Sequence, residues 1–508
     1  MEIFLQLAGV AYFVFAMVNL RLAVVLLPVF FPAYLLKFDL FGVPFPFVEV
    51  CIYGCFLAWM VQIMHQLFTK KITVRTLIEP FRRFWWFAVL GIVVAAVFSV
   101  IVAPQSVVMM DGNTIFYGRK IAMGILKSWI FAPVLMMVLF TSIFKKAEDF
   151  EMAVNAYTIG AVLLAGWGVY QVLTGQYLTP DGRASGPFNS ANYLALFITP
   201  ALLYVSVRLK DFFTVSAESW WMKVLHFFRH PANTRMKFFL GLVWVAAFLV
   251  LLFGLLFTKS YAAFLAYFAA CLFWFFSQIK SFKKFPWALV GVGALVVVLL
   301  VVGLITLDPA KWQMFFQLGT RTSSGVRVEI YTIAIQLLFR HPLTGIGLGM
   351  FPAAYQLEGP QILGHAPYEW NMLHPHNVFL AFWLNLGLLG FLSFLALLGA
   401  MFRKAWKFAV TFAQQHQLTL EWFQGLGLLM MLIILGHGLV DTSFFKNDLA
   451  LLFWLCSSLI LLPVSWRKSG PVSCLFSFFT FSGDSPFGRW KIFFFNLFGF
   501  YLGMGLRR

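Results

Sequence analysis

Charged residues are scarce in this chain. Only 11% of the 508 residues are charged, and 19 acidic residues face 37 lysines and arginines. Soluble domains carry roughly 25% charged residues, so this scarcity excludes an ordinary soluble enzyme. The net charge of +18 lies in short groups between apolar runs rather than on one basic surface. We therefore expect no nucleic-acid partner and assign the excess charge to anionic lipid headgroups and loops retained in the cytoplasm.

Cysteines and metal-ligand motifs are also few. The five cysteines show no disulfide framework, and four lie in apolar runs, where small packing residues are common. The sequence contains no Asp-x-Asp pair and no His/Cys cluster at ligand spacing, so we predict no metal site and no cofactor. The N-terminus lacks a basic region and a cleavage site, which predicts a retained segment rather than a signal peptide.

Apolar residues are abundant: 61% of the chain is hydrophobic and 19% is aromatic. Eleven runs approach the length of about 20 residues that spans a bilayer, and residues 3–36 add one or two more. We predict an all-α, polytopic membrane protein with 12 or 13 spans in one domain, residues 1–466. The Phe-rich tail, residues 467–508, is predicted to be cytoplasmic or interfacial. The runs are 46–66, 84–103, 120–144, 152–174, 190–207, 238–257, 260–278, 287–306, 377–402, 424–440 and 447–465.

Basic residues mark every second loop. Lysines and arginines gather in 67–83, in 208–237 and again in 280–284, which the positive-inside rule places in the cytoplasm. The intervening loops, including the large loop 307–376, then face the opposite side. The sequence thus predicts a multi-pass membrane protein with its largest loop on the non-cytoplasmic side, which in a bacterium is the periplasm or the cell exterior.

Polar residues stand at the mouth of one predicted span. The segment His374-Pro-His376-Asn377 precedes an apolar run, and polar groups beside hydrocarbon are costly unless they have a purpose. If a helix begins near His376, Gly387 lies about three turns below it and Gly390 one turn further, at roughly 3.6 residues per turn. Both glycines would then share one stripe. Such a stripe serves either as a groove for a lipid tail or as a site of close helix packing.

A histidine followed by Asn, nine residues and GxxG resembles the motif of bacterial O-antigen ligases. Their superfamily also contains O-antigen polymerases and protein O-oligosaccharyltransferases. The resemblance extends to Ser324–Arg327, His341–Phe351 and Gly438–Asp441. It implies a glycosyltransferase-C-like architecture with a large periplasmic loop and an outer-face cavity. It also implies metal-independent transfer of a glycan from a polyprenyl diphosphate donor to an acceptor hydroxyl on a lipid or glycan.

Three residues carry this resemblance as catalytic candidates. His376 matches the functional histidine, and an imidazole that titrates near neutrality can take the acceptor's proton. Arg327 and Arg183 resemble the family's functional arginines, whose planar fork suits a diphosphate. The alternative for each arginine is an ordinary loop cation, paired with Glu329 or Asp181.

Weaker candidates surround these three. Asn377 either orients the imidazole or caps the helix, and capping is favoured. Asp441 pairs with an arginine, steadies His376, or simply ends a helix. The weaker substrate-binding candidates are Arg321, Arg340, His374, Asn377, Gly387, Gly390 and Asp441.

Two further classes of function remain open. Within the superfamily, the chain is a ligase, a polymerase that joins repeat units, or a protein O-oligosaccharyltransferase. A transporter of lipid-linked glycans is the alternative of another class. Transporters more often place charged residues within their spans and show inverted repeats. Here the unusual polar residues gather on one face, which favours an enzyme.

Overall fold

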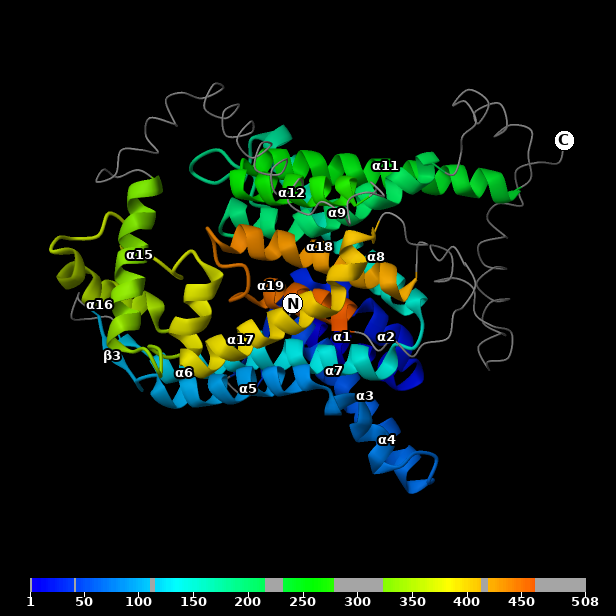
Figure 1. The fold of residues 1–508 in the computed structure, drawn as a ribbon, viewed down its shortest axis with the longest axis horizontal. Helices are drawn as coiled ribbons and strands as arrows, with labels where there is room; N and C mark the ends of the chain where they lie inside the picture. The colour runs from blue at the N-terminus through cyan, green and yellow to red at the C-terminus, as the bar shows by residue number, and fades with distance from the viewer. Residues whose placement is uncertain are drawn as a thin grey trace. The chain divides into compact units, whose positions relative to one another are not determined.

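The computed structural model describes residues 2–40, 43–109, 115–214, 232–277, 323–412 and 419–461. Helices dominate these residues, as Figure 1 shows. The only sheets in the described ranges are two antiparallel hairpins, formed by β1 (Lys37–Leu40) with β2 (Val43–Pro46) and by β3 (Val107–Val108) with β4 (Ile115–Phe116). The predicted all-α class is confirmed.

Eight described helices are long and apolar enough to cross a membrane, and four shorter apolar helices accompany them. This confirms a polytopic membrane protein. The predicted span 287–306, Arg321 and the tail 467–508 lie outside the described residues. The long segments are α3 (Phe47–Phe68), α5 (Phe84–Val102), the run Gly118–Ile143, α8 (Ala147–Thr174), α9 (Ala191–Thr214), α11 (Ala232–Thr258), α17 (Val378–Val410) and α18 (Leu420–Gly438); the shorter ones are α1 (Glu2–Val18), the run Leu20–Leu35, α12 (Tyr261–Phe276) and α19 (Asn447–Leu461).

Local sequence explains where several of these helices begin and end. The run Gly118–Ile143 is one continuous rod in which a π-helical turn, η3 (Leu126–Phe131), joins α6 (Gly118–Ile125) to α7 (Ala132–Ile143). Gly175 ends α8 with a φ of 69°, a left-handed conformation that glycine adopts without strain. The run Leu20–Leu35 divides into α2 (Leu20–Leu26) and the 3₁₀ segment η1 (Leu27–Leu35), which contains two prolines. Between α3 and α5 lie α4 (Val74–Ile78) and η2 (Glu79–Arg82).

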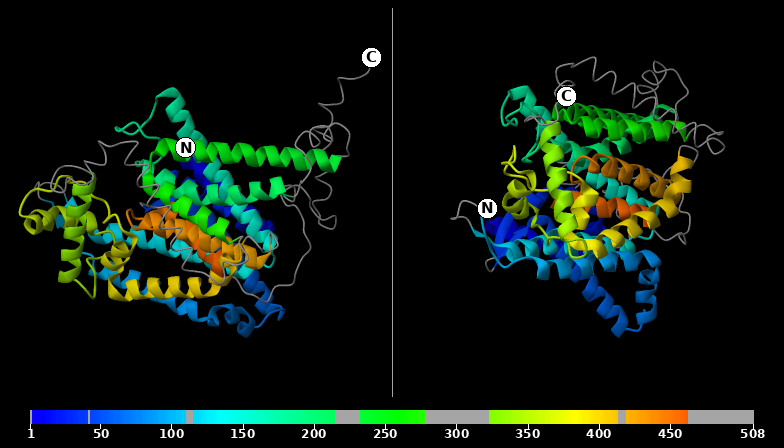
Figure 2. Two further views of the ribbon diagram at one scale, coloured as in Figure 1. Left: turned by 45° about the horizontal axis from the view of Figure 1, so that its top comes forward. Right: turned by 60° about the vertical axis from the view of Figure 1, so that its left-hand side comes forward.

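Helix α17 lies at the centre of the packing. It runs along α5 and packs on α18, while α18 contacts α19 and α12, and α9 contacts α11 and α8 (Figures 1 and 2). Aromatic side chains fill the space around α17. The rings of Phe382 and Phe394 stack with centroids 3.8 Å apart, and Phe444 and Phe445 approach Phe382 from the segment after α18. The polar residues at the start of α17 therefore stand on a rigid support.

A small helical layer covers the beginning of α17. It consists of α15 (Ser323–Arg340) and α16 (Phe351–Leu363), neither of which is among the long apolar helices. Their apolar faces form a separate core with Ile330, Leu337 and Tyr355, and Leu384 of α17 joins it. We call α15, α16 and the loop that continues to residue 377 the outer segment. Figures 1 and 2 show this layer beside one end of the helical bundle.

The predicted continuous stripe beneath His376 is wrong, because α17 is broken at Gly387. This residue has φ 66° and ψ −173°, outside helical geometry. The loop after α15 enters the break: the Ile346 amide donates to the Leu384 carbonyl, and the Leu388 amide donates to the Leu343 carbonyl, both at 2.9 Å. A Cβ on Gly387 would collide with that loop's backbone. Gly387 thus admits a close backbone approach, and a groove role for it stays a prediction.

Gly390 also serves packing. A Cβ at this position would come within 3.2 Å of the Ala95 side chain on α5 and would collide with Leu386. The two helices therefore approach closely here, as the packing alternative for the stripe predicts.

Ion pairs between chain segments mark the opposite end of the bundle. Arg208 near the end of α9 binds Glu151 at the start of α8 at 3.0 Å, and Arg21 binds Asp149 at 2.5 Å. We call these four residues the basic end. Asn192 begins α9, sixteen residues before Arg208, so the two positions are about 24 Å apart along the helix. That separation approaches the thickness of the hydrocarbon core.

Candidate active site

The chain turns sharply just before α17. His376 has a φ of 48°, a left-handed conformation that L residues rarely adopt. Asn377 follows as the N-cap of α17, and its side-chain oxygen accepts hydrogen bonds from the amides of Phe379 and Leu380 at 2.9 and 3.1 Å. The favoured capping role of Asn377 is therefore what the structure contains. Its amide group also donates to the Leu439 carbonyl at 3.0 Å, which joins the start of α17 to the end of α18.

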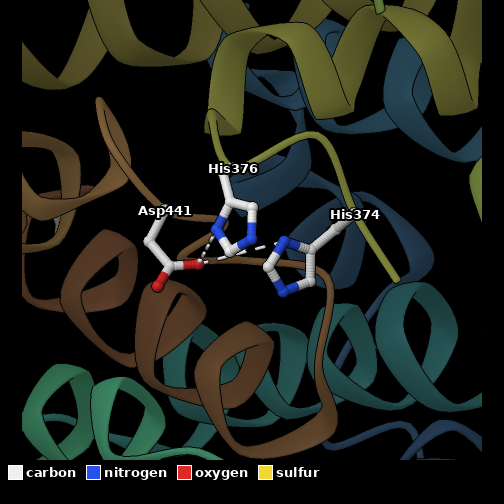
Figure 3. Close-up of side chains that lie close together, drawn as sticks. All are labelled: His374, His376 and Asp441. Carbon is white, nitrogen blue, oxygen red and sulfur yellow. Dashed lines mark ion pairs between the residues drawn. The ribbon is translucent and has the colours of Figure 1, made fainter. Parts of the chain in front are cut away.

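Asp441 lies beside both histidines of this turn. Its Oδ1 is 3.3 Å from Nδ1 of His376 and 3.9 Å from Nδ1 of His374. Figure 3 shows the carboxylate facing the two imidazoles, whose rings lie edge to face with centroids 4.5 Å apart. The Asp441 side chain is only 3% exposed, whereas that of His376 is 24% exposed. Of the three predicted roles for Asp441, the geometry favours steadying His376.

The first turn of α9 completes the surroundings of these groups. The Asn192 side-chain amide donates to Oδ2 of Asp441 at 3.0 Å, and the Tyr193 hydroxyl lies 2.7 Å from Nε2 of His374. The Thr442 amide donates to Oδ1 of Asp441 at 2.7 Å. A carboxylate that accepts such bonds is stabilised in its ionised form. Each polar group therefore has a fixed orientation, as catalytic groups require.

Burial and charge set the protonation states. Burial would raise the pKa of Asp441, but the imidazoles of His376 and His374 outweigh it and hold the pKa well below its ordinary value. Burial lowers the pKa of His374 to about 4, although Asp441 opposes that shift. Asp441 is therefore ionised and His374 neutral at physiological pH. A single carboxylate charge faces His376.

A buried lysine stands next to this group. Lys446 places its Nζ 3.8 Å from the ring centre of Phe188 and 4.2 Å from that of Tyr193, and it lies 3.3 Å from Asp448. Cations over aromatic faces are attracted by the ring quadrupole. Burial lowers the pKa of Lys446, while Asp448 and Asp441 oppose that shift. This cage has no local sequence signal, because Phe188 and Tyr193 come from a segment far from Lys446 in the chain.

Arg327 reaches the same neighbourhood through α15. Tyr331, one helical turn after Arg327, donates its hydroxyl to the His376 carbonyl at 3.1 Å. Burial raises the pKa of Tyr331; the Arg327 charge opposes this shift, and the Asp441 charge adds to it. Tyr331 was missed in the sequence, although its spacing of four from Arg327 places the two on one helix face.

Arg183 is paired with a neighbouring carboxylate. Its Nε lies 2.5 Å from Oδ2 of Asp181, which is the loop-cation alternative predicted from the sequence. The same loop, between α8 and α9, leads directly into Asn192 and Tyr193. The loop thus reaches the histidines, while a role for Arg183 itself stays a prediction.

The remaining candidates lie in the outer segment and serve its structure. Arg340 pairs with Glu358 at 2.5 Å. The glycines of the following turn have left-handed φ values, 64° at Gly345 and 76° at Gly349. The Gly349 amide donates to the Asn385 side chain at 2.7 Å, and the Gly345 amide to the His341 carbonyl at 3.0 Å. Both amides therefore donate their hydrogen bonds within the protein.

The fold brings together a group of potential metal ligands that the sequence did not suggest, and the expected absence of a metal site stays a prediction. Ligand atoms of His374, His376 and Asp441 all lie within 4.8 Å of one another. The sequence could not reveal this group, because Asp441 is 65 positions beyond His376. It is the only group of its kind within the part of the chain that the structure describes.

Comparison with protein families agrees with this geometry. Residues 246–395 match the family model of the O-antigen ligase domain, a segment that includes Arg327 and the turn before α17. This match supports the O-antigen ligase-like superfamily for the chain. No curated protein matches the chain. Together with the apolar helices, the match supports a multi-pass bacterial membrane protein of a glycosyl-transferring superfamily linked to polysaccharide biosynthesis.

The arrangement at His376 suits proton transfer in this superfamily. Because Nδ1 of His376 faces an ionised carboxylate, its proton is held on that nitrogen and the lone pair is directed to Nε2. A carboxylate that holds an imidazole in this way orients it as a general base. The ring is partly exposed, so a hydroxyl can approach it from outside the protein.

Proposed function

We propose that this protein transfers a glycan from a polyprenyl diphosphate donor to an acceptor hydroxyl, in the manner of an O-antigen ligase. The observation that carries the proposal is the ionised Asp441 fixed 3.3 Å from His376, which lies in the segment 246–395 that matches the O-antigen ligase domain. The acceptor oxygen attacks the anomeric carbon, the bond from that carbon to the diphosphate oxygen breaks, and the diphosphate leaves with the bonding electrons. Nε2 of His376 takes the hydroxyl proton.

The leaving diphosphate needs positive charge. Arg327 supplies it in this proposal, because α15 carries this residue one helical turn before Tyr331, whose hydroxyl donates to the His376 carbonyl. Bidentate hydrogen bonds from a guanidinium suit phosphate oxygens. Arg183 is the second proposed donor, and its bond to Asp181 must open for that role. Direct attack by the acceptor would invert the anomeric configuration, and no metal ion takes part in this scheme.

The orientation of the site supports reaction on the outer face. Asn192, which binds Asp441, and Arg208, which belongs to the basic end, lie at opposite ends of α9. The segments near the basic end carry Lys145, Lys146 and Arg208, and such residues favour the cytoplasmic side. The proposed location is therefore the periplasmic face of the inner membrane, with the donor lipid chain in the bilayer.

A transfer assay tests the proposal directly. The purified full-length protein in detergent is supplied with a polyprenyl diphosphate-linked glycan and a candidate acceptor, and products are analysed by mass spectrometry. We expect glycosylated acceptor and free polyprenyl diphosphate without any vectorial movement. Lipid-linked glycan that only changes membrane leaflet in liposomes, with no transfer in detergent, would support the transporter instead.

The acceptor class is tested in a deletion strain. Mass spectrometry of its surface glycans should show short, uncapped acceptor together with accumulated lipid-linked polymer if the protein is a ligase. Accumulation of single lipid-linked repeat units would instead assign the polymerase reaction. Loss of glycan from a protein acceptor would indicate the protein O-oligosaccharyltransferase.

A further inference from the structure

The site contains one more imidazole than a base and its carboxylate require. His374 stands outside the His-Asn motif, yet its Nδ1 lies 3.9 Å from the same Asp441 oxygen that faces His376. Both Nδ1 atoms are buried, and neither makes a hydrogen bond of good geometry to the described residues. Figure 3 shows the three groups facing one shared space. Two nitrogen atoms and one oxygen atom thus converge within 4.8 Å.

We propose that His374, His376 and Asp441 bind a zinc ion, and that the bound ion inhibits transfer. Two imidazoles and a carboxylate suit zinc, whereas magnesium prefers oxygen ligands in octahedral geometry. Zinc–nitrogen bonds of about 2.0–2.1 Å in tetrahedral geometry separate ligand atoms by about 3.3 Å. The 3.3 Å between Asp441 and His376 matches this spacing. Nδ1 of His374, 3.9 Å from the same oxygen, has to move closer by about 0.6 Å.

The neighbours of the three groups hold them in this orientation. Nε2 of His374 is engaged by the Tyr193 hydroxyl at 2.7 Å, and Oδ2 of Asp441 by the Asn192 amide at 3.0 Å. Metal-binding histidines and carboxylates usually have such outer partners, which direct the remaining atom at the ion. Three protein ligands leave a fourth tetrahedral position for a solvent molecule. The 24% exposure of His376 gives the ion a route to the site.

Inhibition follows from the ring chemistry and rests on the proposed function. In the active form, His376 holds its proton on Nδ1 and offers the Nε2 lone pair to the acceptor. Zinc takes the Nδ1 lone pair, so the one ring proton of the neutral imidazole moves through solvent to Nε2. No electron is exchanged and no proton is lost from the ring. Nε2 then donates a hydrogen bond and cannot accept the acceptor's proton.

Direct zinc binding is the decisive measurement. The full-length protein, purified with chelator and then freed of it, is dialysed against zinc chloride with excess magnesium, and bound zinc is measured by mass spectrometry. We expect one zinc per chain, with affinity at least tenfold lower in His374→Gln and Asp441→Asn. His65→Gln is the matched control, because His65 is exposed at the end of α3. X-ray absorption should show nitrogen and oxygen ligands with imidazole scattering.

Equal zinc binding by the wild type and both site variants would overturn the zinc site, as would no binding at all. Thermal melting of each variant verifies that it is folded, and His374→Gln keeps the test available if Asp441→Asn does not fold. In the transfer assay, each protein is compared with its own zinc-free rate. We expect zinc to inhibit the wild type, a chelator to restore it, and the inhibitory concentration to rise at least tenfold in His374→Gln.

The two proposals can fail separately. Transfer by a protein that binds no zinc would leave the proposed function standing and remove the zinc site. Zinc binding by a protein that never transfers a glycan would leave the zinc site standing and remove the proposed function. Stimulation of transfer by zinc would overturn the inhibitory role.

Discussion

Buried carboxylates have different partners at the two ends of the bundle. At the basic end, Glu151 pairs with Arg208 at 3.0 Å, and Asp149 pairs with Arg21. Guanidinium groups remain charged at every physiological pH, so these pairs hold helices together without changing state. At the site end, Asp441 faces the imidazoles of His376 and His374 instead. An imidazole can act as a general base, whereas a guanidinium group cannot. The comparison therefore indicates that the basic end is structural and that the site end is suited to acid–base chemistry.

A cavity of about 590 Å³ is lined by Arg83, just before α5, and by Arg403 and Lys404, in the last part of α17. Its size does not make it the active site. The residues that line it include neither a histidine nor a carboxylate. Their guanidinium and ammonium groups suit phosphate oxygens. The chemistry of the lining residues, rather than the volume of the space, distinguishes this cavity from the site at Asp441.

Removing the base should have the largest effect. His376→Ala is expected to lower the transfer rate by about 10³-fold, because general-base catalysis contributes on that scale. Single-turnover transfer with a saturating donor measures this loss. His365→Ala, an exposed histidine of the outer segment, should keep the wild-type rate. A rate near wild type in His376→Ala would remove the base assignment.

Removing the proposed phosphate ligand should come next. Arg327→Ala is expected to lower transfer by roughly 10²–10³-fold, because it removes charge where the diphosphate leaves. Donor titration should show that the loss is mainly in the rate at saturation rather than in donor affinity. The exposed Arg119 on α6 provides the control, and Arg119→Ala should retain activity. Equal loss in both variants would argue against a specific role.

The third test exchanges a carboxylate for an amide at the site end. Asp441→Asn should lower transfer by about 10²-fold, because the amide no longer holds the His376 proton on Nδ1. The pH profile of the remaining activity should also change, which a purely structural loss would not produce. An unchanged profile with normal rates would show that the carboxylate does not act on His376.

The same exchange at the basic end should affect stability alone. Glu151→Gln weakens the charge-assisted bond to Arg208 and is expected to lower the free energy of unfolding by about 2 kcal/mol. Thermal melting in detergent measures the change. Transfer by the folded fraction should remain at the wild-type rate. A large specific loss of activity in this variant would break the division between the two ends.

Acid should lower the stability of the folded protein through His374 at the site end, by less than the Glu151 variant does. The pKa of His374 falls from 6.5 to about 4 in the folded protein, so the unfolded chain binds the proton first as the pH drops. Stability should therefore decline between pH 6.5 and 5, by roughly 1.5 kcal/mol from this group. The groups that face His374 are His376, Asp441, Lys446 and Tyr193.

His374→Gln is the matched variant for this pH effect. It lacks the titrating group, so its melting temperature should fall less than that of the wild type between pH 6.5 and 5. Parallel curves for the two proteins would show that His374 does not contribute to the acid sensitivity.

Apolar runs predicted the helices well because hydrocarbon permits little else than a helix for a backbone that must satisfy its own hydrogen bonds. The runs near 46–66, 84–103 and 120–144 all became helices within a few residues of their predicted bounds. The break in α17 was missed, since an unbroken helix is the simplest expectation for an apolar run and would place both glycines on one face. Only the loop that inserts beside Gly387 makes the break favourable.

The residues of the site divide in the same way into those that the sequence predicted and those that it did not. His376 stood out in the sequence because polar groups at the mouth of a span are costly, and Asn377 was recognisable as a cap. The partners Asn192, Tyr193, Tyr331 and Lys446 were not recognisable in the sequence, since they come from three segments far apart in the chain and none forms a local motif.

Composition and periodic charge by themselves determined a polytopic helical membrane protein with an unusual histidine at one helix mouth. These properties depend on the free energy of single segments in lipid, which follows directly from the amino-acid composition of each segment. The pairing of that histidine with Asp441, and the addition of His374, were decided only by the tertiary structure. Electrostatic interactions act through a few ångströms of space, and folding alone sets which residues come that close.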